Sequence, residues 1–177
     1  MKRLLKAASV AAVLCLMTTA AWAQQKFGHI NTQELFQLMP EVKTANEAFE
    51  AFRKTKLGEL EQMDAEAQKK IAEFQEKQKT RSEGNRVTVD AELEAIASSI
   101  QNIRERIGQV EQKAQQQLQQ KQQELYTPIQ AKVDNTIKAV AKDKGYTYVF
   151  DTADPMVKYF EGGDDLMADV KTRLGIK

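Results

Sequence analysis

Apolar residues recur at helical spacing through most of the chain, from residue 40 to residue 144. The positions between them are filled mainly by Gln, Lys, Glu and Ala, which are good helix formers. One polar segment interrupts the pattern, residues 82–86 (SEGNR), and its central Gly-Asn is typical of a turn. The pattern therefore predicts two long helices folded back on each other as an antiparallel hairpin. With a rise of about 1.5 Å per residue, such an arm is roughly 60 Å long.

The two predicted helices carry different apolar repeats. In the first helix the repeat is eleven residues, in the rows Leu38, Phe49, Leu60, Ile71 and Phe52, Met63, Phe74. In the second it is seven residues, in the rows Leu93, Ile100, Ile107, Ala114 and Ile96, Ile103, Val110. An eleven-residue repeat stays on one face with little supercoiling, whereas a seven-residue repeat is typical of a coiled-coil seam. We expect the two narrow seams to bury each other and the remaining faces to meet water.

Glutamine dominates residues 112–123 of the second helix, where Leu118 is the only large apolar residue. Two interpretations stay open, since composition alone does not separate them: a polar wall facing an internal water-filled space, or a solvated low-complexity helix. Pro128 follows, and we expect it to kink or locally open the helix. After it an apolar stripe resumes, at Ile129, Val133, Ile137 and Val140.

The first residues have the layout of a secretory signal peptide. A basic start, residues 1–6, precedes an apolar run over residues 7–20 and then Ala21-Trp22-Ala23, the small-x-small pattern that signal peptidase cleaves after. The apolar run is too short for a transmembrane helix, which needs about 20 residues. We therefore predict cleavage after Ala23 and export to the periplasm.

Composition narrows the function of the mature chain. The single cysteine, Cys15, lies in the signal peptide, so disulfides and thiolate chemistry are excluded after cleavage. Removing Lys2, Arg3 and Lys6 lowers the basic residues from 26 to 23 against 25 acidic residues, a net charge of −2. This balance gives no support to nucleic-acid binding, which calls for a basic excess.

The sequence offers no catalytic constellation. It contains no nucleophile–base pair, no cluster of metal ligands and no glycine-rich phosphate loop. His29 is the only histidine, and a zinc site needs several ligands, so we expect His29 to be structural. The carboxylates lie on helix faces predicted to be solvated, where little would shift their pKa values. We expect no enzymatic activity, no catalytic residue, no cofactor and no metal.

Short elements flank the predicted hairpin. Residues 26–31 read as a strand, and Asn31 with Glu34 fits the cap of a helix over residues 32–39, ended by Pro40. Beyond the hairpin, Gly145 closes the long helix and residues 146–151 form a strand. Residues 156–160 are predicted as a further strand. Asp164 or Asp165 then caps a last helix that Gly175 stops.

These elements predict a mostly helical protein with a small β base. We divide it into a signal peptide at 1–23, a body at 24–39 and 129–177, and an arm at 40–128. Three short strands and a small helix bury too little surface to anchor such an arm, and their open edges invite pairing with another chain. We therefore predict oligomerisation through the body, with interface residues Phe27, Ile30, Tyr148 and Phe150.

The order of elements resembles the Skp/OmpH family of periplasmic chaperones, along the whole mature chain. The residues that carry the resemblance are 26–31 (KFGHIN) with Leu35 and Phe36, 146–151 (YTYVFD), and Asp164-Asp165-Leu166 before Val170 and Lys171. Residues 125–133 (LYTPIQAKV) look like the form in Bacteroidetes-type members.

The resemblance implies a homotrimer whose strands combine into one small β-barrel, with three arms around a central cavity. It implies an ATP-independent holdase, which keeps unfolded outer-membrane β-barrel proteins soluble before insertion, and it leaves contact with a membrane surface open. Well-studied relatives are strongly basic. Here the arm tip carries Lys77, Lys79, Arg81 and Arg86, yet residues 76–106 contain six acidic and six basic residues. The alternative is a structural periplasmic coiled-coil spacer or adaptor.

Overall fold

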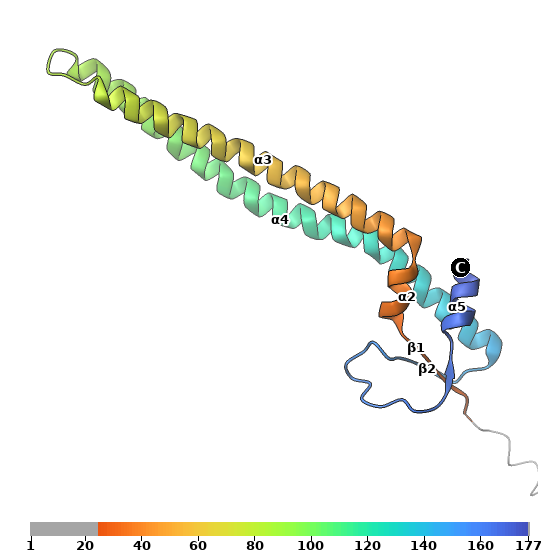
Figure 1. Cartoon of the computed structure of the whole chain (residues 1–177). Coiled ribbons are helices and arrows are strands. Elements are labelled where there is room, and N and C mark those ends of the chain that lie inside the picture. The colour runs from red at the N-terminus through yellow and green to blue at the C-terminus, as the bar shows by residue number, and fades with distance from the viewer. Residues whose placement is uncertain (1–24, 177) are drawn as a thin grey trace, which may run out of the picture. The chain divides into compact units, whose positions relative to one another are not determined.

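The computed structural model describes residues 25–176, so the predicted signal peptide lies outside the described residues. The described chain is mostly helical with a three-stranded sheet, as predicted (Figure 1). Its elements are β1 (Phe27–Ile30), α2 (Thr32–Leu38), α3 (Pro40–Lys79), α4 (Arg86–Lys144), β2 (Tyr148–Asp151), β3 (Asp164–Asp165) and α5 (Met167–Leu174). It divides into two compact units. The arm comprises residues 40–131, and the body comprises the described residues before and after them.

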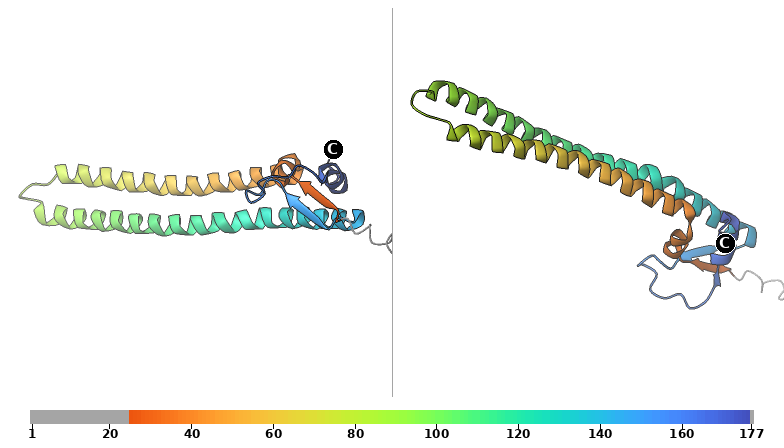
Figure 2. Two further views of the ribbon diagram at one scale, coloured as in Figure 1. Left: turned by 90° about the horizontal axis from the view of Figure 1, so that it is seen from below. Right: turned by 45° about the horizontal axis from the view of Figure 1, so that its top comes forward.

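In the arm, α3 and the first part of α4 run side by side in opposite directions (Figures 1 and 2). The predicted turn between them is confirmed, and Asn85 explains why it forms there. Its side chain accepts a hydrogen bond from the Ser82 N–H (2.6 Å) and donates one to the Thr80 carbonyl (2.8 Å). Its own carbonyl accepts a bond from the Val89 N–H in the first turn of α4. One asparagine therefore closes the loop and starts the second helix.

The predicted seams are confirmed within the arm, and the structure adds a third row to α3. The two predicted eleven-residue rows are half-buried along α3. The most buried positions lie in a row at Ala45, Lys56 and Ala67, with exposed fractions of 4% and 6% for the two alanines. Leu38 does not extend the first row, because it ends α2 and is 43% exposed. The α4 seam follows the predicted seven-residue spacing and is deepest at Val89, Ile103 and Ala114.

Pro128 does not open α4. The helix continues through it to Lys144, so the predicted local opening is wrong. Proline removes a single N–H donor at its own position. In a helix of 59 residues, the bonds of the turns on both sides remain. The glutamine-rich residues 112–123 are helical as well.

The body is built around a small parallel sheet with the strand order β2-β1-β3. β1 pairs with β2 from Phe27↔Tyr148 to Ile30↔Asp151, and with β3 at Gly28↔Asp164 and His29↔Asp165. Glycine allows this close packing at Gly28, where a Cβ would collide with the Leu166 side chain. The Asp151 carboxylate also accepts hydrogen bonds from the Thr32 N–H and hydroxyl, which ties β2 to the start of α2.

The strand predicted over residues 156–160 is wrong. The chain is irregular there, and the third strand is instead the two-residue β3. Asp154 explains the start of this irregular stretch, since its side chain accepts a bond from the Met156 N–H and its carbonyl one from the Val157 N–H. A strand also needs a partner, and residues 156–160 pair with no strand of the sheet: β3 occupies the second side of β1, and the outer edge of β2 has no strand beside it.

The predicted helix ends are mostly confirmed. Asn31 caps α2 by accepting a bond from the Glu34 N–H (3.0 Å), and Gly145 and Gly175 follow α4 and α5 in the left-handed conformation that suits glycine. The N-cap position of α5 is Leu166 rather than an aspartate. Asp165, one residue earlier, still accepts a hydrogen bond from the Met167 N–H (2.8 Å). The Asp165 carboxylate therefore accepts a hydrogen bond from the first turn of α5 although Asp165 is not the N-cap residue.

The body has a continuous apolar core. Its fully buried side chains come from β1, α2, α4 and α5 and from the residues next to α2 and α5: Ile30, Leu35, Met39, Val133, Leu166 and Val170. None is more than 2% exposed. No helix among residues 25–176 is long and apolar enough to cross a membrane.

Candidate functional site

The body presents an aromatic cluster on one face of its sheet. The rings of Phe27, Tyr148 and Phe150 are stacked, with centroid separations of 5.8 Å, 6.4 Å and 6.3 Å. Their exposed fractions are 42%, 53% and 46%. Large aromatic side chains exposed together on a unit with its own core are the kind of surface that another polypeptide covers.

Of the four residues predicted for an interface, only Ile30 lies outside this cluster. It is 1% exposed and belongs to the core of its own chain. Side chains alternate along a strand, so Phe27 and Ile30, three positions apart, point to opposite faces of the sheet. Sequence reasoning could have separated them from this parity alone.

The loop between β2 and β3 extends the aromatic surface, and sequence reasoning missed it. Met156, Tyr159 and Phe160 are 83%, 77% and 51% exposed. Together with Phe27 and Phe150 they line a hollow of about 540 Å³. His29 also borders this hollow, where its ring lies 5.3 Å from that of Phe160 and its buried Nδ1 has no hydrogen-bond partner among the described residues.

The outer edge of β2 is a second open feature of the body. Within the described chain β2 pairs only with β1, so its other edge has no strand beside it. A hollow of about 300 Å³ lies here, lined by Ile137 and Ala141 of α4 and by Tyr148 and Val149 of β2. An open edge flanked by a helix is a surface to which a further strand can add.

A cluster of three polar side chains joins β3 to the rest of the body. The Tyr146 hydroxyl donates a hydrogen bond to Asp164 (2.7 Å), and Lys26 lies 3.3 Å from the same carboxylate and 4.0 Å from the centroid of the Tyr146 ring. The hydrogen bond from Tyr146 and the ammonium of Lys26 lower the pKa of Asp164. Hydrogen bonding between the Lys26 ammonium and Tyr146 is the largest of the causes that raise the pKa of Lys26. Three segments that are distant in sequence are thereby joined around one carboxylate.

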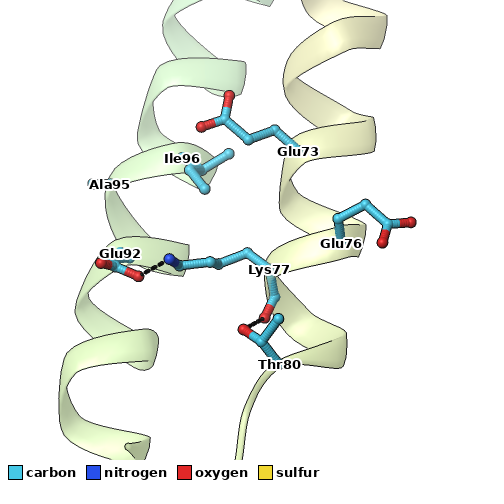
Figure 3. A pocket seen from close by; sticks show the side chains of 7 residues that line it. All are labelled: Glu73, Glu76, Lys77, Thr80, Glu92, Ala95 and Ile96. Carbon is cyan, nitrogen blue, oxygen red and sulfur yellow. Dashed lines mark hydrogen bonds and ion pairs between the residues drawn. The ribbon is translucent and has the colours of Figure 1, made fainter.

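Three of the four basic residues predicted at the arm tip form ion pairs with acidic residues. Lys77 of α3 reaches across to Glu92 of α4 (2.5 Å), as Figure 3 shows. Arg81 binds both carboxylate oxygens of Asp90, at 2.5 Å and 3.0 Å, and Lys79 pairs with Glu76 on its own helix. The bond with Arg81 lowers the pKa of Asp90, with a smaller contribution from the charge of Arg86. The pairs of Lys77 and Arg81 tie α4 to the end of α3 and the turn, and all three pairs neutralise basic charge at the tip.

The glutamine-rich part of the arm is polar even along its seam. Gln117, Leu118 and Lys121 are half-buried, while the other glutamines of residues 112–123 are exposed. On α3, Lys56 lies in the buried row, with 16% of its side chain exposed and its Nζ paired with Glu59 at 2.9 Å. Both interpretations of the glutamine-rich segment, the wall of a water-filled space and the solvated helix, stay open.

These features are exposed surfaces of a kind suited to contact with another polypeptide. Among residues 25–176, no group of three or more His, Cys, Asp or Glu side chains could hold a metal ion. The arrangement offers an aromatic face and an open strand edge in the body, and a long polar surface on the arm.

Comparison with known proteins agrees with this picture. The family model described as outer membrane protein (OmpH-like) matches residues 26–174. The Vibrio cholerae protein named chaperone protein Skp is 30% identical over 156 residues, which cover 86% of this chain and 88% of that protein. The protein of the same name from Photorhabdus luminescens is 29% identical over 170 residues, 96% and 97% of the two chains. The chain therefore belongs to the OmpH-like family.

Proposed function

We propose that this chain is an ATP-independent periplasmic holdase. It binds unfolded outer-membrane β-barrel proteins and prevents their aggregation before membrane insertion. The name chaperone, carried by the relatives from Vibrio cholerae and Photorhabdus luminescens, supports a chaperone role. Binding and release then need no catalysis, which agrees with a surface built for contact alone.

The observation that carries the proposal is the construction of the arm. Its large apolar residues lie mainly in one narrow seam between α3 and α4, and its other faces are polar. Such a surface can make many weak contacts with an unfolded chain without fixing it in one conformation. Affinity then comes from multivalency rather than from a single strong site.

Self-association through the body completes the proposed holdase. The exposed cluster of Phe27, Tyr148 and Phe150 and the open edge of β2 both support contact with further copies of this chain. We propose a homotrimer, the state implied by the family resemblance, so that three arms surround one client. In this proposal the body mediates assembly, and the arm, predicted from the sequence at residues 40–128, binds the client.

The test uses a urea-unfolded outer-membrane β-barrel protein diluted into buffer with the mature chain. We expect suppressed aggregation and a soluble complex whose mass equals one client plus three copies. Deleting residues 65–107, which shortens both helices of the arm, is expected to leave a folded, assembled body that no longer holds the client. A parent protein that leaves aggregation unchanged would favour a structural spacer. Full activity of the shortened protein would show that the deleted part of the arm is not needed to hold the client.

A further inference from the structure

Two grooves flank the seam in the outer part of the arm, and their linings differ. One, the acidic groove, is lined by Glu73, Glu76, Lys77 and Glu92, together with Thr80, Ala95 and Ile96 (Figure 3). The other, the amide groove, is lined by Ile71, Phe74, Gln75, Gln78, Ala97, Ile100, Gln101 and Arg104. The two linings share no residue. Helical spacing of about 100° per residue places them on opposite sides of the seam.

The acidic groove is occupied by its own charges. Each of its three carboxylates is paired with an ammonium group: Glu92 with Lys77 across the space between the helices (Figure 3), and Glu73 and Glu76 with Lys70 and Lys79 of α3. Lys70 lowers the pKa of Glu73, so this carboxylate stays ionised near neutral pH. A polypeptide that docked here would have to desolvate these carboxylates or break the ion pair, and both cost free energy.

The amide groove has the opposite character. Ile71, Phe74 and Ile100 form a half-buried apolar floor, and three exposed glutamines stand at its sides. A glutamine amide both donates and accepts hydrogen bonds, so it can pair with the N–H or the C=O of any peptide backbone. The amide nitrogen of Gln101 already donates one hydrogen bond to Glu105 (3.1 Å) and keeps its second N–H and its oxygen for such a contact. Arg104 adds the only formal charge of this lining, and it has no hydrogen bond or ion pair with the described part of the chain.

We propose that the amide groove is the face of the outer arm on which an extended segment of unfolded polypeptide docks. The lining on α3 spans residues 71–78, about 10 Å of helix, which is room for about three residues of extended chain. An alternating apolar–polar segment, as β-barrel strands provide, places side chains on the floor and leaves its backbone to the glutamines. A segment of neutral or negative charge suits Arg104 here, whereas in the acidic groove it would have to displace or desolvate the ion pairs.

The inference rests on the proposed holdase function and specifies which side of the arm contacts the client. Three docked residues give weak binding, which agrees with capture by many copies of a weak contact. It also assigns the two sides of one arm to different roles. The amide groove faces the client, and the acidic groove faces solvent.

Site-specific photo-crosslinking tests this assignment directly. A benzoylphenylalanine is placed at Gln78 in one variant and at Glu76 in the matched control, two exposed positions of α3 on opposite sides of the seam. Each variant is mixed with the urea-unfolded outer-membrane protein and irradiated. We expect severalfold more crosslinked client from position 78, and position 75 serves as a second probe of the same groove. Equal yields, or a higher yield from position 76, would overturn the inference.

A charge-matched pair of variants gives an independent readout. Gln75→Glu with Gln78→Glu adds two carboxylates beside the amide groove, and Gln62→Glu with Gln68→Glu adds two at exposed positions of α3 outside its lining. We expect severalfold weaker client binding for the first pair only, with unchanged helix content by circular dichroism. Equal affinities would contradict the proposal. If the parent suppresses aggregation but these comparisons fail, the holdase function stands and the groove assignment falls. If the parent itself does not suppress aggregation, the proposed function falls.

Discussion

The body and the arm of this chain use apolar residues in opposite ways. In the body, Leu35, Val133, Leu166 and Val170 are completely buried, although the sheet has only three short strands. In the arm, the positions below 7% exposure before Pro128 are three alanines, one valine and one isoleucine. Because the stabilisation from burial scales with the apolar area removed from water, alanine contributes little at each position. The body therefore concentrates its burial in a few completely buried side chains, and the arm spreads its burial over a long seam of half-buried ones.

The surfaces differ in the reverse sense. The body exposes seven large apolar residues, Phe27, Leu38, Tyr148, Phe150, Met156, Tyr159 and Phe160. Within the arm, the exposed large apolar residues are Leu57 and Val87. A unit with a firm core and an aromatic surface suits a fixed association. A unit with a thin seam and a polar surface suits contacts that form and dissolve. The predictions below test this contrast, starting with the largest expected effect.

Replacing Ile30 with aspartate is expected to unfold the body. The side chain is 1% exposed, and a carboxylate there would lose its hydration without gaining a partner. That penalty is a large part of the roughly 5–15 kcal/mol by which a domain is stable. Urea unfolding followed by tyrosine fluorescence should show no cooperative body transition. A variant as stable as the parent would place Ile30 outside the core.

Replacing Phe150 with aspartate is expected to separate assembly from folding. The side chain is 46% exposed within the single chain, so the body should keep its fold while the aromatic cluster becomes charged. Light scattering should then report a monomer with the helix content of the parent. A trimer that persists in Phe150→Asp would show that the aromatic cluster is not the interface.

Local signals in the sequence were sufficient for much of this fold. The turn at residues 82–86 could be predicted because Asn85 makes its bonds to residues three and five positions away. The cap at Asn31 is equally local. The strand over residues 156–160 failed for the opposite reason, since a strand depends on a distant partner, and these residues pair with neither β1 nor the open edge of β2. Composition indicated a strand there, but pairing decided against it.

The candidate site was less predictable because it depends on which residues face each other across the arm. The basic residues of the tip were visible in the sequence, but their pairing with Glu92 and Asp90 follows from the register of α3 against α4. The buried row of Ala45, Lys56 and Ala67 was missed because only large apolar residues were counted as seam. The two unlike grooves beside the seam follow from the same register.

Amide hydrogen exchange should rank the two units directly. We expect the slowest exchange near Val133 and Val140, which belong to the body core, and the fastest at residues 80–90 around the turn. Exchange by local opening follows local stability, and the turn is surrounded by few buried side chains. Mass spectrometry of peptides from both regions provides the measurement. Uniform protection along the arm would favour a rigid spacer instead.

The smallest expected effect concerns the ion pair of Arg81 and Asp90 beside the turn. The hydrogen bonds from Arg81 lower the pKa of Asp90 below its usual value of 3.8. A carboxylate with a lowered pKa in the folded state stabilises that state above the unfolded pKa, and the contribution is lost as pH falls through the folded pKa. The ion pair of Arg81 and Asp90 should therefore stabilise the arm tip at neutral pH. This contribution should be lost only when the pH falls through the lowered pKa of Asp90.

A carboxyl carbon NMR titration of Asp90 would measure this pKa. In the parent we expect a midpoint below 3.8, and in Arg81→Gln a midpoint that moves upward, since the main cause of the lowered pKa is removed. Lys79→Gln is the matched control, because Lys79 pairs with Glu76 on its own helix and not with Asp90. Both side chains are exposed, so added salt should also raise the parent's midpoint by screening. Identical midpoints in the parent and Arg81→Gln would mean that this contact does not hold the tip together in solution.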